Sequence, residues 1–235
     1  MRSLLLVSCN DPDALAVALD SGADALVLDL EAAGSNSGRE TARNFIMDAR
    51  RQQRRLRIFV RINGLDTDQA DLDLDAVMPA GPDGIVLARS RSGADVQHLG
   101  AKLAVHEAQN GLPDGACAIL PIVTQTAVSL FGLSSYVGAS PRLIGLAWSA
   151  QDFAVALGAS AFNSVDGYTA PCQLARTLTL VGARAAAVEP IDTAFDGHDE
   201  AELRRECEAA RRDGFTAKIA LDAAQVRIIN EAFKP

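Results

Sequence analysis

Short runs rich in valine, isoleucine and leucine alternate along the chain with longer segments of helical periodicity. This alternation is typical of βαβ units, in which helices connect parallel strands. The runs predicted as strands are Ser3–Ser8, Ala25–Leu28, Arg57–Arg61, Gly84–Leu87, Ala116–Pro121, Leu143–Ala147, Ala187–Ile191 and Thr216–Ala220. The amphipathic stretches predicted as helices include Pro12–Ser21, Gly38–Gln53, Ala94–Asn110, Gln173–Ala183 and Glu200–Arg212.

The number of predicted strands indicates the architecture. Eight strands, each followed by a helix, predict a closed (β/α)8 barrel of the TIM type, which usually needs about 250 residues. The chain has 235 residues, of which 49% are apolar and 22% charged, as in ordinary globular proteins. Because no stretch rich in proline, glycine and serine marks a linker, we expect residues 1–235 to form a single α/β barrel domain.

Charge and cysteine content exclude several classes of protein. The formal charge of −8 disfavours binding to nucleic acid or to anionic membrane surfaces. Polar residues interrupt every apolar run before it reaches the roughly 20 residues of a transmembrane helix. The four cysteines lie far apart without a C-x-x-C pair, which favours reduced thiols over a disulfide framework or a zinc site. These features predict a cytoplasmic protein whose ligand is a small molecule.

Polar residues follow most of the predicted strands. They are Asp29 and Glu31, Arg61 and Asn63, Arg89, Gln125, Asp152, and Asp192, in chain order. In a barrel of this type the carboxyl ends of the strands carry the chemistry, so we expect these side chains at one rim. Arg61 and Arg89 are suited to bind a carboxylate, and Asp152 to help hold a hard divalent cation. Salt bridges that only close the top of the barrel, such as Arg61 with Glu31 or Asp29, are the alternative.

The order and spacing of several strings along the chain resemble the citrate lyase β-subunit family, within the HpcH/HpaI aldolase group. The strings are Arg2–Val7, Ser21–Glu31, Val60–Gly64, Pro79–Leu87, Ile119–Thr126, Gly145–Asp152, Pro190–Thr193, Gly214–Lys218 and Ala224–Pro235. The resemblance implies a Mg²⁺-dependent barrel that cleaves or forms a carbon–carbon bond in β-hydroxy-acyl-CoA thioesters or related 2-oxo and hydroxy dicarboxylic acids. Citryl-CoA and malyl-CoA are familiar substrates of the family.

The resemblance also implies roles for individual residues. Gln125 and Asp152 match the positions of the metal ligands. Arg61 matches the arginine that binds the substrate, with Asp29 and Glu31 beside it as further catalytic residues and Glu31 orienting the guanidinium. Asn63, Arg89 and Gln125 are expected to contact the substrate. Members of this family are commonly trimers or hexamers, so we expect a homo-oligomer.

The chain also departs from the family's usual pattern. Amides stand at Gln125 and Gln151 where glutamate is usual, Ala32 replaces an acid, and Asp222 replaces a histidine. Since Mg²⁺ prefers anionic oxygen ligands, we expect weak or substrate-dependent binding. The sequence ends at Pro235 where many relatives continue into a helix and lid, so we expect a barrel without that lid. Three interpretations stay open: an active lyase, a weakly active or non-catalytic paralogue that binds an acyl-CoA or dicarboxylate as a subunit or sensor, and a metal-independent aldolase-type enzyme.

Overall fold

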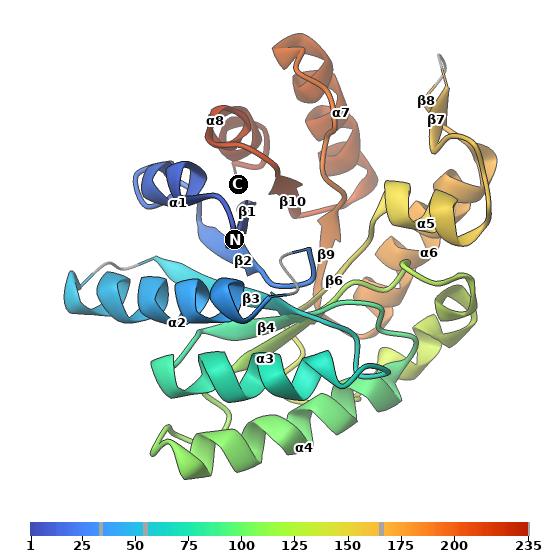
Figure 1. The fold of residues 1–235 in the computed structure, drawn as a ribbon. Helices are drawn as coiled ribbons and strands as arrows, with labels where there is room; N and C mark the ends of the chain where they lie inside the picture. The colour runs from blue at the N-terminus through green and yellow to red at the C-terminus, as the bar shows by residue number, and fades with distance from the viewer. Residues whose placement is uncertain (33–34, 54–55, 165–166, 235) are drawn as a thin grey trace.

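The computed structural model describes residues 1–32, 35–53, 56–164 and 167–234, in which eight parallel strands form one sheet (Figure 1). The strands are β1 (Ser3–Ser8), β2 (Ala25–Asp29), β3 (Arg57–Ile62), β4 (Gly84–Leu87), β5 (Ala118–Pro121), β6 (Gly145–Ala147), β9 (Glu189–Asp192) and β10 (Ala217–Ala220). Their order in the sheet is β5, β4, β3, β2, β1, β10, β9 and β6. Each run predicted as a strand therefore forms one, with ends that differ by at most two residues from the prediction.

The two outermost strands of this order, β5 and β6, meet and close the barrel. Isolated parallel bridges join Ile119 to Leu143 and Ile122 to Ala147. The Ile144 N–H donates to the Ile119 carbonyl at 3.1 Å, and the Val123 N–H donates to the Ala147 carbonyl at 2.9 Å. The predicted (β/α)8 barrel is confirmed.

Helices surround the strands on the outside (Figure 1). They are α1 (Pro12–Ala18), α2 (Asn36–Arg51), α3 (Gln69–Val77), α4 (Gly93–Gln109), α5 (Ala150–Ala156), α6 (Ala170–Ala185), α7 (Glu200–Asp213) and α8 (Ala223–Ala232). After β5 the connection is the 3₁₀ segment η2 (Ala127–Tyr136) instead of an α-helix. Gly132 lets η2 approach the backbone closely, because a Cβ there would lie 2.2 Å from the Arg91 carbonyl oxygen. A short hairpin of β7 (Asn163–Ser164) and β8 (Gly167–Tyr168) precedes α6.

The alternation of side chains along each strand divides the apolar residues into two cores. The inner core fills the barrel with at least one residue from every strand: Leu4, Ala25, Val27, Phe59, Val86, Leu120, Ile122, Ala147, Ile191 and Ala217. The outer core lies between the sheet and the helices and includes Leu26, Leu28 and Val60. Since successive side chains of a strand point to opposite faces, this parity decides which polar residues open into the barrel mouth.

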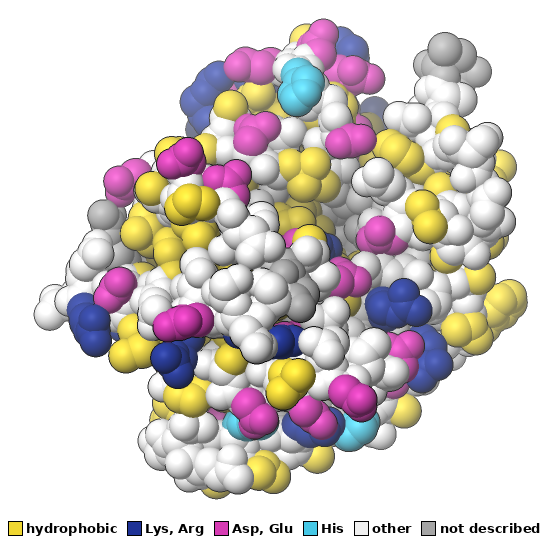
Figure 2. All heavy atoms as spheres, in the orientation of Figure 1, with side chains coloured by type: hydrophobic (Ala, Val, Ile, Leu, Met, Phe, Trp, Pro, Cys, Tyr) yellow, Lys and Arg dark blue, Asp and Glu magenta, His cyan; other side chains and the backbone are white. Residues whose placement is uncertain are grey.

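The surface agrees with the acidic composition of the chain. In Figure 2, acidic side chains are spread over the face shown and interspersed with lysine and arginine. Within the described ranges, no helix has both the length and the apolarity to cross a bilayer. Pro235, the expected end of the barrel, lies outside the described residues.

Candidate functional site

The inward parity of β2 and β3 brings Asp29 and Arg61 together at the mouth of the barrel. The two residues are register partners, each two positions beyond an inner-core residue. The Arg61 guanidinium donates through Nε and Nη2 to the two oxygens of Asp29, both at 2.7 Å. This two-pronged contact fixes the plane of the guanidinium as well as its charge. Asp29 is buried, and 15% of the Arg61 side chain stays exposed.

Glu31 lies beside this pair. Its Oε2 atom is 3.4 Å from Arg61 Nη1, so Asp29, rather than Glu31, is the main partner that holds the arginine. Burial raises the pKa of Glu31, although the charge of Arg61 opposes the shift. Burial would lower the pKa of Arg61, but its hydrogen bonds to Asp29 and the negative charges of Asp29 and Glu31 outweigh burial and raise that pKa. The arginine is therefore a permanent positive charge among acids.

Gln125, which follows β5, connects Glu31 to Asp152. Its Nε2 atom donates to Glu31 Oε1 and Oε2 at 3.1 and 3.2 Å, and to Asp152 Oδ2 at 3.1 Å. Its Oε1 atom accepts from the Arg89 backbone N–H at 2.7 Å. The amide nitrogen therefore faces the carboxylates, whereas Gln125 could hold a metal, as predicted, only through its oxygen.

Asp152 stands in the first turn of α5, and hydrogen bonds fix that turn. Its backbone N–H donates to the side chain of the N-cap residue Ser149 at 3.3 Å. The Ser149 N–H donates to Thr124 Oγ1 at 2.8 Å, and the Ala150 N–H donates to Thr193 Oγ1 at 3.2 Å. We call the five residues that this arrangement brings together the rim cluster: Asp29, Glu31, Arg61, Gln125 and Asp152.

Two residues predicted to contact the substrate have other partners. Asn63 donates through its backbone N–H and its side-chain amide to Asp73, at 3.0 and 2.8 Å. Asp73 is buried and also pairs with Arg39 at 2.7 Å, so Asn63 helps to attach α3 to the barrel. The Arg89 side chain is 48% exposed and lies 3.9 Å from Asp66, its nearest acid. Only the Arg89 backbone reaches the rim cluster.

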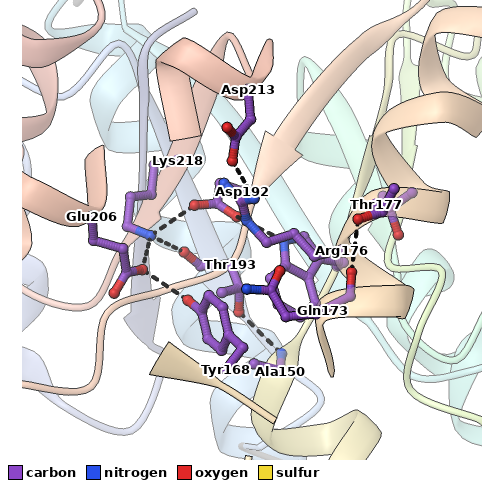
Figure 3. A network of polar contacts seen from close by, with 12 residues as sticks. Ala150, Tyr168, Gln173, Arg176, Thr177, Asp192, Thr193, Glu206, Asp213 and Lys218 are labelled. Carbon is purple, nitrogen blue, oxygen red and sulfur yellow. Dashed lines mark hydrogen bonds and ion pairs between the residues drawn. The ribbon is translucent and has the colours of Figure 1, made fainter. Parts of the chain in front are cut away.

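Asp192, the third exception, points away from the mouth. It follows the inner-core residue Ile191 and therefore faces outward. It is fully buried, accepts from Trp148 Nε1 at 2.7 Å, and lies 3.1 Å from Lys218 Nζ (Figure 3). The prediction that Asp192 belongs to the rim overlooked this parity.

The sequence analysis missed a second group of charges around Lys218. Lys218 is completely buried and donates to Asp192, to the Thr193 carbonyl at 2.7 Å, and to Glu206 at 2.5 Å (Figure 3). The Tyr168 hydroxyl donates to Glu206 at 2.8 Å. Burial alone would lower the pKa of Lys218, but the charges of Asp192 and Glu206 outweigh burial and raise it. Burial also raises the pKa of the Tyr168 hydroxyl.

A further cation and acid complete this group. Arg176 lies 3.5 Å from Asp192 and donates to Asp213 at 2.6 Å. We call Tyr168, Arg176, Asp192, Glu206, Asp213 and Lys218 the buried cluster. A lysine within the apolar run of β10 is the sequence signal that could have revealed it.

The rim cluster offers carboxylates to a divalent cation. Glu31 and Asp152 supply the hard oxygen atoms that Mg²⁺ prefers, and Mg²⁺ commonly takes one or two carboxylates and completes its shell with water and substrate oxygens. Among the described residues, no group of three or more histidine, cysteine or acidic side chains is arranged to hold a metal. The residues therefore fit an ion that depends on additional ligands. Gln151, the other amide at a position where glutamate is usual in the family, is exposed.

Comparison with known proteins identifies the family. A family model described as HpcH/HpaI aldolase/citrate lyase matches residues 2–223. The chain belongs to this family. The citrate lyase subunit beta of Leuconostoc mesenteroides subsp. cremoris is 29% identical over all of this chain and 77% of its own length. A (3S)-malyl-CoA thioesterase of Cereibacter sphaeroides is 32% identical with the same coverage.

Solved structures of this family have the same fold. RipC from Yersinia pestis is 29% identical, with a TM-score of 0.76 over all of this chain and 95% of that one. CitE from Mycobacterium tuberculosis, in complex with magnesium, acetoacetate and coenzyme A, is 26% identical, with a TM-score of 0.78 over all of this chain and 81% of that one. Family members thus crystallise with magnesium, as the resemblance implies.

Proposed function

We propose that this member of the family is a carbon–carbon lyase of the aldolase or Claisen type. Its proposed substrates are β-hydroxy-acyl-CoA thioesters, such as citryl-CoA or malyl-CoA, or related 2-oxo and hydroxy dicarboxylic acids. The observation that carries the proposal is the Arg61 guanidinium, held by Asp29 in the barrel mouth beside Glu31 and Asp152. The names of the relatives support the thioester chemistry.

The geometry of Arg61 suits the reaction. Cleavage of the bond next to a carbonyl leaves negative charge on the carbonyl oxygen, and a fixed positive charge stabilises that charge as it forms. Arg61 has five N–H donors, of which Asp29 takes two, so donors are left for a substrate oxygen. A magnesium ion held by Glu31 and Asp152 would supply further polarisation of the carbonyl.

Product analysis tests this function and separates it from the alternatives. The protein is incubated with malyl-CoA and with citryl-CoA, with and without Mg²⁺, and the products are resolved by chromatography. A lyase gives acetyl-CoA and an oxo acid, whereas a thioesterase gives free CoA and the intact hydroxy acid. Loss of cleavage in Arg61→Met is expected. A protein that binds either thioester without changing it would instead be the non-catalytic subunit or sensor.

We also propose that residues 1–235 act as a single-domain, cytoplasmic homo-oligomer, a trimer or hexamer. All four cysteines are buried as free thiols, which supports a reducing compartment. Light scattering after size-exclusion chromatography measures the oligomeric state, and a monomer at micromolar concentration would overturn that part of the proposal.

A further inference from the structure

One amide joins two acidic side chains in the rim cluster. The Gln125 Nε2 atom has two hydrogens and lies within 3.2 Å of three carboxylate oxygens, two from Glu31 and one from Asp152. Glu31 comes from the end of β2, whereas Asp152 comes from α5, on the other side of β5 in the closed barrel. Gln125 is therefore a direct link between these two parts of the mouth.

The orientation of this amide follows from its partners. Its oxygen accepts from the Arg89 backbone N–H, a group that only donates, and its nitrogen faces ionisable carboxylates, which accept. The reversed amide would place oxygen against the carboxylates and NH₂ against N–H. Arg89 also has a left-handed backbone with φ of 56°, an unusual conformation for a residue other than glycine. The chain thus adopts an uncommon local conformation where it presents this N–H.

We propose that Gln125 is a positioning residue whose amide takes the place of a divalent cation between Glu31 and Asp152. Two partly buried carboxylates side by side repel each other unless a positive group or a hydrogen-bond donor lies between them. The amide supplies donors to both, so the acid pair is assembled without metal. A cation that binds these oxygens then has to displace the amide. Only the identity of the molecule that occupies the mouth rests on the proposed function, since metal binding and folding are measured without turnover.

Two substitutions have opposite consequences for this amide. In Gln125→Glu the donors are lost and a third carboxylate joins the pair. We expect the metal-free protein to melt at a lower temperature and Mg²⁺ to restore the loss, with Mg²⁺ affinity about ten- to a hundredfold above that of the unmodified chain. In Gln125→Met, similar in length but with neither donor nor acceptor, the carboxylates are freed from the amide. We expect its Mg²⁺ affinity to rise as well, by less than in Gln125→Glu.

The experiment is a calorimetric Mg²⁺ titration of the full chain, with melting temperatures measured in chelator and in Mg²⁺. Gln151→Glu is the matched control, because it adds the same charge at an exposed position next to Asp152 in the chain. We expect it to change neither quantity appreciably.

Two results would overturn the proposal. If Gln125→Met bound Mg²⁺ more weakly than the unmodified chain, Gln125 would be a metal ligand through its oxygen. If Gln125→Glu melted in chelator at the unmodified temperature, the amide would not hold the acid pair. Should Gln125→Glu fail to fold, Gln125→Met alone decides through the direction of its affinity change. Absence of lyase activity in the unmodified chain, by contrast, would count against the proposed function only.

Discussion

The rim cluster and the buried cluster both combine carboxylates with cations, but their cations differ in how many N–H donors are left without an acceptor. The Lys218 ammonium has three N–H donors and three acceptors around it, in Asp192, Thr193 and Glu206. The Arg61 guanidinium has five donors and gives two of them to Asp29. Lys218 is fully buried, whereas Arg61 is partly open to solvent.

The charge balance differs in the same direction. In the buried cluster three carboxylates face two cations, Arg176 and Lys218. In the rim cluster three carboxylates face Arg61 alone, and an amide links two of the acids. The unused N–H donors of Arg61 can bind an anionic ligand, and the excess carboxylates of the rim cluster can bind a cation. We therefore propose that the buried cluster stabilises the fold and that the rim cluster binds ligands.

The largest expected effect comes from removing Lys218, one of the two cations of the buried cluster. Lys218→Met keeps the length of the side chain but leaves the fully buried Asp192 and the partly buried Glu206 without their shared partner. We expect the free energy of unfolding to fall by about 3–5 kcal/mol, measured by urea denaturation. Arg51→Met is the control, since the Arg51–Asp48 pair is mostly exposed and its loss should cost less than about 1 kcal/mol. Equal losses in the two variants would contradict a structural role for the buried cluster.

The pH dependence of stability sharpens the same comparison. Because the pKa of Lys218 is raised in the folded protein, its contribution is fully present below the usual lysine pKa of about 10.4. The contribution is lost as the pH rises through the folded value. The difference in unfolding free energy between the unmodified chain and Lys218→Met should therefore be constant from pH 7 to pH 9 and should shrink in stronger alkali. A difference that grew with pH would show that Lys218 is not held as a cation.

At the rim, a substitution that keeps the charge should still reduce binding. Arg61→Lys retains a positive group but loses the fork that fits both oxygens of Asp29. We expect affinity for oxaloacetate or pyruvate, measured by calorimetry with Mg²⁺ present, to fall about tenfold or more. Arg89→Lys is the control, because that side chain is 48% exposed and lies outside the rim cluster. Unchanged affinity in Arg61→Lys would mean that the anion binds by charge alone, and an equal loss in Arg89→Lys would mean that the loss is not specific to Arg61.

The alternation of apolar runs and helical segments predicted the ends of the strands to within two residues. Short apolar runs of this kind are buried on both faces, as strands of a parallel sheet are. The pattern was weaker for α3, whose sequence Gln69–Val77 alternates acid and apolar residues as a strand would. There Leu74 is buried while Leu72 is 48% exposed, so burial follows the period of a helix, which Asp73 attaches to Asn63.

The site divides in the same way. Position after a strand correctly grouped Asp29, Glu31, Arg61, Gln125 and Asp152. It did not show that Asp192 lies apart from these residues, because whether a side chain points into or out of the barrel depends on its position in the alternation along the strand. The orientation of the Gln125 amide depends on the Arg89 N–H, a backbone contact across 36 positions that no local pattern encodes.

The smallest expected effect is the loss of one hydroxyl from the buried cluster. Tyr168→Phe keeps the edge-on packing against Trp148, whose ring centre is 5.2 Å away, and removes the hydrogen bond to Glu206. We expect a loss of about 1.5 kcal/mol in unfolding free energy, because the acceptor is charged. Tyr136→Phe, which removes a hydroxyl contact with the neutral Ser90, is the control and should cost about 1 kcal/mol or less. A larger loss in the control would rule out a special contribution from Glu206.

The division of labour between the two clusters is tested most directly by the rise in melting temperature that oxaloacetate and Mg²⁺ produce, measured for the unmodified chain, Arg61→Lys and Tyr168→Phe. A ligand that binds the folded state raises the melting temperature by an amount that grows with the logarithm of its affinity. We predict that Tyr168→Phe starts from a lower temperature and shows the full rise, whereas Arg61→Lys loses most of the rise. A full rise in Arg61→Lys together with a lost rise in Tyr168→Phe would place ligand binding at the buried cluster and contradict the account.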